Sequence, residues 1–228
     1  MSTRFTNRAE AGAALAQVLL RLDLPGPVVV LALPRGGVPV AAVIAKALHA
    51  PLDLVLVRKI GVPSQPELAV AAVAEGDPPV IVVDEQVRRW AGVDMDYIES
   101  AARRESLENA RRREVYLSGH AAPERAGRTL ILVDDGVATG STMRAALRAV
   151  RTQRPRAVVL AVPVAAAQTL QRLRAEVDHV VCLVQPVAFE AVGDYYDDFH
   201  QLDDAQVIAA LQAARQTGTA EGSDVRPD

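Results

Sequence analysis

The sequence predicts an α/β fold in which an open, mostly parallel sheet carries helices on both faces. Apolar runs recur along the chain that are long enough for one buried strand and too short for a helix. They cover residues 28–33, 52–57, 130–133, 156–162 and 179–184. Helical segments separate most of these runs, and this alternation is typical of a parallel sheet. Half of the residues are hydrophobic but only 4% are aromatic, so the core must consist of Ala, Val and Leu.

The first strand and its loop form a candidate anion site. Residues 4–22 precede it and have the spacing of an amphipathic helix. The strand over residues 28–33 leads through Pro34-Arg35-Gly36-Gly37 into a predicted helix over about residues 38–48. A Gly-rich loop between a strand and a helix can turn its free N–H groups onto an anion.

The middle of the chain departs from this alternation. The strand over residues 52–57 ends in the cationic pair Arg58 and Lys59, and residues 68–73 and 80–83 predict a hairpin. Within residues 85–117, Asp94 is a predicted N-cap for a long, charged helix. Its arginines, at 103–104 and 111–113, suit either an RNA-facing surface or a solvated helix that covers the core or a dimer partner. Interspersed acids and scarce aromatics favour the second interpretation.

The most informative stretch runs from Leu130 to Thr142. A buried strand ends at Asp134 and Asp135, and a loop of small residues with Gly136 and Gly140 then leads into a helix. Free N–H groups and hydroxyls at a helix N-terminus bind anions, yet two adjacent carboxylates would repel a lone phosphate. A ligand with a phosphate at one end and vicinal hydroxyls further along, such as ribose 5-phosphate, satisfies both features.

This stretch closely resembles the phosphoribosyl pyrophosphate (PRPP) motif of the type I phosphoribosyltransferases. The resemblance implies that Asp134 and Asp135 hold the ribose hydroxyls. It implies that the 5′-phosphate lies on the following loop, made of Val137, Ala138, Thr139, Gly140, Ser141 and Thr142. It also implies the fold of that family, with a helical insertion and a small C-terminal hood.

Two further loops resemble parts of the same family. Pro34-Arg35-Gly36-Gly37 resembles its pyrophosphate loop, so Arg35, Gly36 and Gly37 are expected to bind pyrophosphate, or else to form a simple tight turn. Arg58 and Lys59 resemble the start of a mobile loop that closes over PRPP. By this resemblance, Arg58 and Lys59 join Asp134 and Asp135 as the candidate catalytic residues.

Aromatic residues gather after the last predicted strand. The resemblance implies a hood here that stacks on the acceptor base, with Phe189, Tyr195, Tyr196 and Phe199 as candidates for its wall. A small satellite core that fixes the last helix, at residues 203–215, fits the same pattern equally well.

The chain is expected to form a single domain over residues 1–228. Its core should cover about residues 25–188, with a helical insertion at about 85–118, hood and C-terminal helix at about 189–215, and a disordered tail at 218–228.

Composition and resemblance together predict the cellular location, the partners and the activity of the protein. A net charge of −3 argues against bulk nucleic-acid binding, and the single Cys182 excludes an internal disulfide. No signal peptide or membrane span is evident, so a cytoplasmic protein is expected, as a homodimer. The implied activity is transfer of ribose 5-phosphate from PRPP to a nitrogenous acceptor, with Mg²⁺ bound mainly through pyrophosphate and no direct metal ligand in the protein. The alternative is a regulator of the same fold that senses PRPP or nucleotides and binds nucleic acid or a partner protein.

Overall fold

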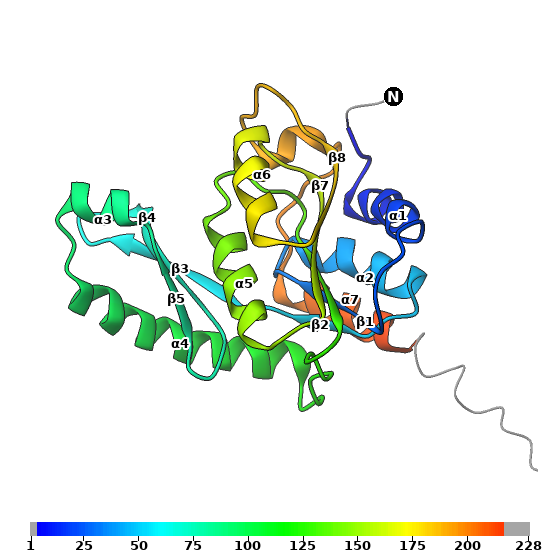
Figure 1. Ribbon diagram of the computed structural model, residues 1–228, viewed down its shortest axis with the longest axis horizontal. Helices are drawn as coiled ribbons and strands as arrows, with labels where there is room; N and C mark the ends of the chain where they lie inside the picture. Colours follow the sequence, from blue (N-terminus) through cyan, green and yellow to red (C-terminus); the bar gives the residue numbers. More distant parts are fainter. Residues whose placement is uncertain (1–3, 217–228) are drawn as a thin grey trace, which may run out of the picture.

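A five-stranded, fully parallel sheet forms the centre of the computed structural model, which describes residues 4–216 (Figure 1). Its strands lie in the order β2-β1-β6-β7-β8. They are β1 (Val28–Ala32), β2 (Leu52–Leu54), β6 (Thr129–Val133), β7 (Ala157–Val164) and β8 (His179–Val184). The predicted open, parallel α/β fold is confirmed.

Helices cover both faces of this sheet, which explains why its strands are apolar without interruption. Along β1 and β6, alternate residues point to opposite faces and each meets a helix layer. One layer consists of α1 (Arg8–Leu19), α2 (Gly37–Ala47) and α7 (Asp204–Gln216). The other consists of α5 (Ser141–Thr152), α6 (Ala167–Leu173) and the short 3-10 helix η1 (Arg174–Glu176).

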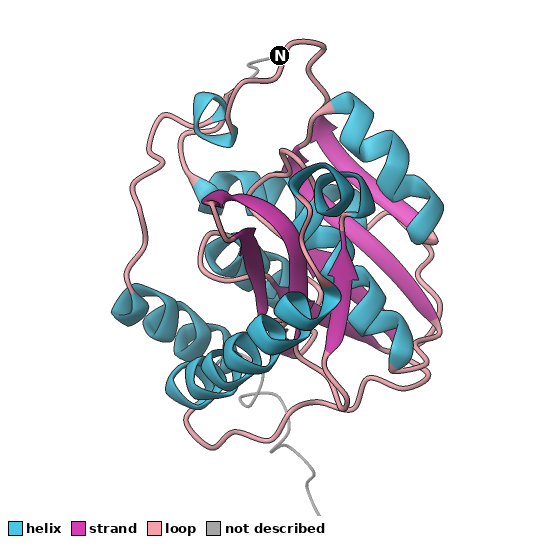
Figure 2. Ribbon diagram, turned by 90° about the vertical axis from the view of Figure 1, so that its left-hand side faces the viewer, coloured by secondary structure: helices cyan, strands magenta, loops and turns pink. Residues whose placement is uncertain are grey.

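An arm extends from the edge of the main sheet and contains three antiparallel strands (Figures 1 and 2). These are β3 (Val57–Val62), β4 (Gln65–Ala74) and β5 (Val80–Val83), followed by α3 (Glu85–Ala91) and α4 (Met95–Leu117). The predicted hairpin is confirmed, because β4 pairs with β5. A single strand over residues 52–57 is wrong, since the chain leaves the parallel sheet after Leu54 and Val57 already pairs with Ala74 of β4.

The arm is a packed layer between two helices. One face of its sheet, with Ile60 and Val73, packs on Ile98 of α4. The other face, with Ala72, packs on Ala145 of α5. Because α5 begins at the predicted phosphate loop, this packing holds the arm beside the candidate site.

The segment after β8 returns to the N-terminus of the chain. It contains the 3-10 helix η2 (Val192–Tyr195), and Phe5 forms a parallel bridge with Tyr196 directly after it. The tail predicted to be disordered lies outside the described residues. Within residues 4–216, no helix combines the length and the apolar character that crossing a bilayer requires.

Candidate functional site

Two loops from neighbouring strands meet at the carboxyl edge of the main sheet. Strands β1 and β6 pair in parallel, and the Leu33 amide donates to the Val133 carbonyl at 2.9 Å where both strands end. The loop of Gly36 therefore lies against Asp134 and Asp135, which directly follow β6. Ligands of open α/β sheets bind at this edge. The fold thus brings together the two loops that the sequence predicts to hold pyrophosphate and ribose.

The loop after the two aspartates presents backbone N–H groups that find no protein acceptor among the described residues. Thr169 of α6 donates its hydroxyl to the Ala138 carbonyl at 2.7 Å, and Gly140 adopts a left-handed conformation with φ +80° before α5 begins. Within residues 4–216, the amides of residues 138–142 donate to no protein group. Five such amides, together with the hydroxyls of Thr139, Ser141 and Thr142, suit a phosphate at a helix N-terminus.

Val137 has a different role from the rest of that loop. Its N–H donates to the Val164 carbonyl at 2.9 Å, and its side chain is buried. The amide of this residue is therefore not available to a ligand, although the sequence-based prediction includes it. Val137 instead fixes the loop to strand β7.

Asp134 and Asp135 occupy unequal surroundings. Burial, followed by the neighbouring Asp135 charge, raises the pKa of Asp134 well above its ordinary value. Burial also raises the pKa of Asp135, but the Arg8 guanidinium opposes this shift through a 2.8 Å bond from Nε to Oδ2. Asp135 is consequently the member of the pair that stays ionised more readily.

Arg8 is a site residue that the sequence reasoning missed. It lies at the first position of α1, where the macrodipole of the helix disfavours a cation. The unfavourable place of this charge is the signal in the sequence, because a carboxylate from another element can offset it. The Arg8 and Asp135 side chains are 9% and 14% exposed, so their ion pair is largely shielded from water.

The loop after β1 brings backbone groups to the candidate site, whereas its charged side chain, Arg35, is bonded elsewhere. The Pro34-Arg35 peptide bond is cis, and Gly37 donates its N–H to the Leu33 carbonyl at 3.0 Å. Arg35 donates a hydrogen bond from Nη1 to the Leu202 carbonyl at 2.7 Å, so its guanidinium lies against the segment before α7.

Arg58 and Lys59 lie within β3 and are strand residues. That the hairpin they begin closes over PRPP stays a prediction. Both pair with β4 in the antiparallel sheet. Arg58 bonds Glu105 of α4 at 2.7 Å, on the face away from α5. Lys59 is exposed and lies opposite Ala72, whose face of the sheet packs on α5. Of the two cations, Lys59 is thus on the side of the phosphate loop.

The four aromatic residues of the hood separate into two pairs. Tyr196 is 2% exposed and donates its hydroxyl to the Asp135 carbonyl at 2.6 Å, while its ring stacks on Phe199. Tyr196 is therefore a core residue beneath the site and is not available as a stacking surface for a base. Phe189 and Tyr195 stack on each other with centroids 5.8 Å apart and stay partly exposed.

Comparison with known proteins identifies the family. Residues 4–200 match the model of the phosphoribosyl transferase domain. The chain belongs to this family. Two curated proteins of Mycobacterium tuberculosis, strains CDC 1551 and H37Rv, which carry the provisional name phosphoribosyl transferase, are each 43% identical over 212 residues. These matches cover 93% of the chain, which spans about half (47%) of the length of each relative.

A solved structure supports the fold of this phosphoribosyl transferase domain. The crystal structure of the protein TT1426 from Thermus thermophilus is 46% identical, with a TM-score of 0.78. The similarity covers 92% of this chain and 98% of the other.

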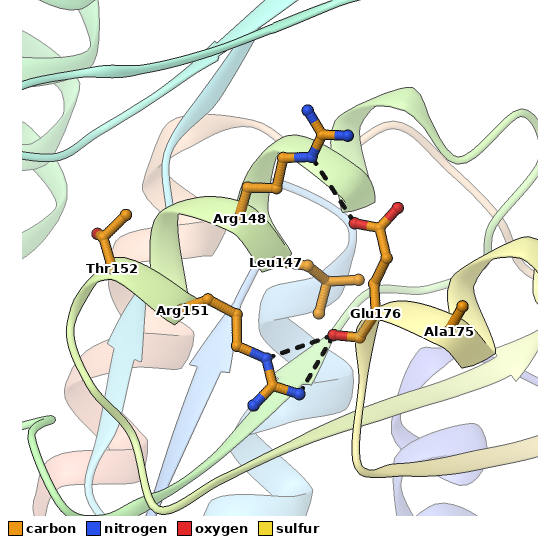
Figure 3. Close-up of a pocket in the computed structure, with 6 residues that line it drawn as sticks. All are labelled: Leu147, Arg148, Arg151, Thr152, Ala175 and Glu176. Atoms are coloured by element: carbon orange, nitrogen blue, oxygen red, sulfur yellow. Dashed lines mark hydrogen bonds and ion pairs between the residues drawn. The ribbon is translucent and has the colours of Figure 1, made fainter.

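The domain also carries a hollow away from the two loops. It measures about 530 Å³ and lies between the second half of α5 and η1 (Figure 3). Glu176 accepts a hydrogen bond from Arg151 at its carbonyl oxygen, and its carboxylate forms a 3.9 Å ion pair with Arg148. This hollow contains none of the predicted site residues.

Proposed function

We propose that this domain binds PRPP and transfers its phosphoribosyl group to a nitrogenous acceptor with release of pyrophosphate. One observation carries the proposal: two carboxylates directly precede a loop whose five amides, at residues 138–142, have no protein partner in the described chain. The family supports the same reaction class. A nucleobase is the acceptor that we favour, because Phe189 and Tyr195 leave a partly exposed aromatic pair in the hood.

In this proposal, the protein positions its substrate more than it takes part in covalent chemistry. Asp135, as the more readily ionised carboxylate, accepts a hydrogen bond from one ribose hydroxyl, and Asp134 holds the other. The amides of residues 138–142 fix the 5′-phosphate, so the anomeric carbon has a defined place relative to the acceptor. Backbone groups at Gly36 stabilise the negative charge on the departing pyrophosphate. The side chains of Arg35 and Lys59 approach this group and add positive charge.

Mg²⁺ fits this site as a companion of the substrate. Within residues 4–216, no group of three or more His, Cys, Asp or Glu side chains could form a metal cage. Mg²⁺ retains several waters and binds readily through substrate phosphates, so we propose that it reaches the site with the diphosphate and takes no direct ligand from the protein. When bound, the ion would neutralise charge on the diphosphate.

The first experiment is calorimetric titration with PRPP and Mg²⁺, followed by a panel of bases with pyrophosphate release as the readout. We expect binding, with release stimulated by one base. The double variant D134N/D135N should lose PRPP binding while it stays folded. The matched control, D23N/D96N, removes two exposed carboxylates elsewhere and changes the net charge equally. Its PRPP affinity should equal that of the wild type.

Three outcomes would count against parts of the proposal. PRPP binding without pyrophosphate release in the presence of any base would favour a sensor of PRPP over a transferase. Unchanged affinity in D134N/D135N would defeat the ribose assignment. Absence of binding in the wild type would defeat the whole proposal.

A further inference from the structure

Arg8 joins three parts of the candidate site. Its Nε bonds Asp135 Oδ2 at 2.8 Å, and its Nη1 donates to the His200 carbonyl at 3.1 Å. Its guanidinium also lies over the Phe199 ring, 4.0 Å from the centroid. A single side chain of α1 thus contacts the end of β6 and the segment between η2 and α7.

The same carboxylate is restrained from its other sides. Tyr196 holds the Asp135 carbonyl, and a Cβ at Gly36 would overlap Asp135 Oδ2. The Asp135 side chain therefore lies in a fixed slot, with the Arg8 guanidinium against one oxygen. A carboxylate held in this way is ordered before any ligand arrives, which lowers the entropic cost of binding.

We propose that Arg8 is a positioning residue that keeps Asp135 ionised and oriented for a ribose hydroxyl and that links this carboxylate to the hood. The inference rests on the proposed function, because it assigns Asp135 to the sugar. Arg8 itself acts through Asp135 and through the His200 backbone. An arginine suits this position better than a lysine, because its planar fork can bond two acceptors while its face covers an aromatic ring.

PRPP binding should depend on pH through the ionisation of Asp135, and the charged neighbours of this carboxylate influence that ionisation. Asp134 directly precedes it in the loop after β6, and Tyr196, whose pKa burial raises, lies beneath it. Asp198, hydrogen-bonded to the His200 ring, adds charge near Arg8, whereas Arg35 points to the segment before α7. Of these groups, Arg8 is the cation bonded to Asp135.

The sign of the effect follows from that contact. Arg8 lowers the pKa of Asp135, so its removal raises that pKa. Binding that needs the ionised carboxylate is lost as the pH falls through this pKa, and a higher pKa moves the loss to higher pH. An opposite charge at this range shifts a carboxyl pKa by about one to three units.

The test measures the PRPP dissociation constant in the presence of Mg²⁺ against pH for the wild type, R8Q, R8K and R4Q. For R8Q, we expect the midpoint of the pH dependence to rise by about one unit or more. R8K should restore most of the midpoint, because its charge remains, with weaker binding at every pH. R4Q is the matched control: it removes an arginine that bonds Asp197 and the Tyr196 carbonyl and does not touch Asp135. Its midpoint should equal that of the wild type.

Titration of PRPP itself is common to all four proteins and cancels from the comparison. Circular dichroism at each pH identifies any variant that unfolds. If R8Q binds more weakly by the same factor at every pH, Arg8 is merely structural and the inference is overturned.

A second readout separates this inference from the proposed function. The carboxyl carbon of Asp135, followed by NMR in the protein without ligand, should titrate at higher pH in R8Q than in the wild type. If the wild type fails to bind PRPP but this shift appears, the proposed function fails and the control of Asp135 by Arg8 stands. An unchanged titration would overturn the inference whatever binds.

Discussion

Gly36 faces the Asp135 carboxylate so closely that no larger side chain fits between the two loops. Its backbone angles, φ −60° and ψ −35°, are open to any residue, so conformational freedom is not the reason for a glycine here. The reason is space, because an added Cβ would overlap Asp135 Oδ2. The glycine thus lets the loop after β1 approach the candidate ribose-binding pair.

Gly36→Ala should weaken PRPP binding by about tenfold or more, since the methyl group displaces Asp135 from its slot and misplaces its oxygen. Calorimetry with Mg²⁺ measures the effect. Gly92→Ala is the control, because a Cβ there meets nothing within 4 Å, although its φ is +62°. Strain should reduce the stability of this control by about 1 kcal/mol and leave its PRPP affinity unchanged. Equal affinity in both variants would contradict the role given to Gly36.

At the scale of elements, buried ion pairs attach the arm to the main sheet. Asp53 of β2 accepts two 3.0 Å bonds from Arg113 of α4 and one 2.6 Å bond from Arg125, which precedes β6. Arg113 also bonds Glu75, directly after β4. Although burial acts in the opposite direction, Arg125 and Arg113 hold the pKa of Asp53 below its ordinary value. Burial prevails at Glu75 and raises its pKa.

Arg125→Ala should destabilise the protein by about 3 kcal/mol, because it leaves the charge of Asp53, which is 2% exposed, without one of its two partners. Urea unfolding followed by circular dichroism measures this loss. Arg128→Ala is the matched control, because its pair with Glu124 is more exposed and longer, at 3.6 Å. Its stability should change by less than about 1 kcal/mol. Similar losses in the two variants would show that the network does not hold the arm.

On the scale of the whole molecule, three of the five arginines of α4 are paired with carboxylates. Arg111 and Arg112 both bond Glu108, and Arg113 faces the main sheet, where it pairs with Asp53 and Glu75. The chain as a whole carries a net charge of −3. A regulator that binds nucleic acid through this helix would need these cations to contact phosphate groups and not carboxylates of the protein.

The protein should therefore show no measurable binding to labelled RNA or DNA at about 0.15 M salt, where the Debye length is about 8 Å. Fluorescence anisotropy across a salt series tests this prediction, with an arginine-rich peptide as the positive control. Affinity that falls steeply with salt would instead favour the nucleic-acid-binding regulator. In that event, Arg103→Gln with Arg104→Gln would show whether α4 is the surface involved.

The sequence by itself determined the parallel sheet, the helices on both faces, the hairpin and the two Gly-containing loops. Each of these depends on local features. Strands that are buried on both faces are apolar throughout, and small residues after a strand leave backbone N–H groups open to an anion. Residues 137–142 could be named as a candidate phosphate loop in this way, because that prediction depends on their own backbone and not on distant partners.

Only the tertiary structure decided which side chains meet. Arg8 lies 127 residues from Asp135 along the chain, and no local pattern joins them. In the sequence, Tyr196 fits a base-stacking wall and a satellite core equally well; the structure buries it and bonds its hydroxyl to a backbone carbonyl 61 residues away. Likewise, Arg58 and Lys59 follow an apolar run that would end at the sheet edge, and the pairing of β3 with β4 carries them into the arm. Partners such as these depend on how whole elements pack, so they follow from the fold and not from spacing along the chain.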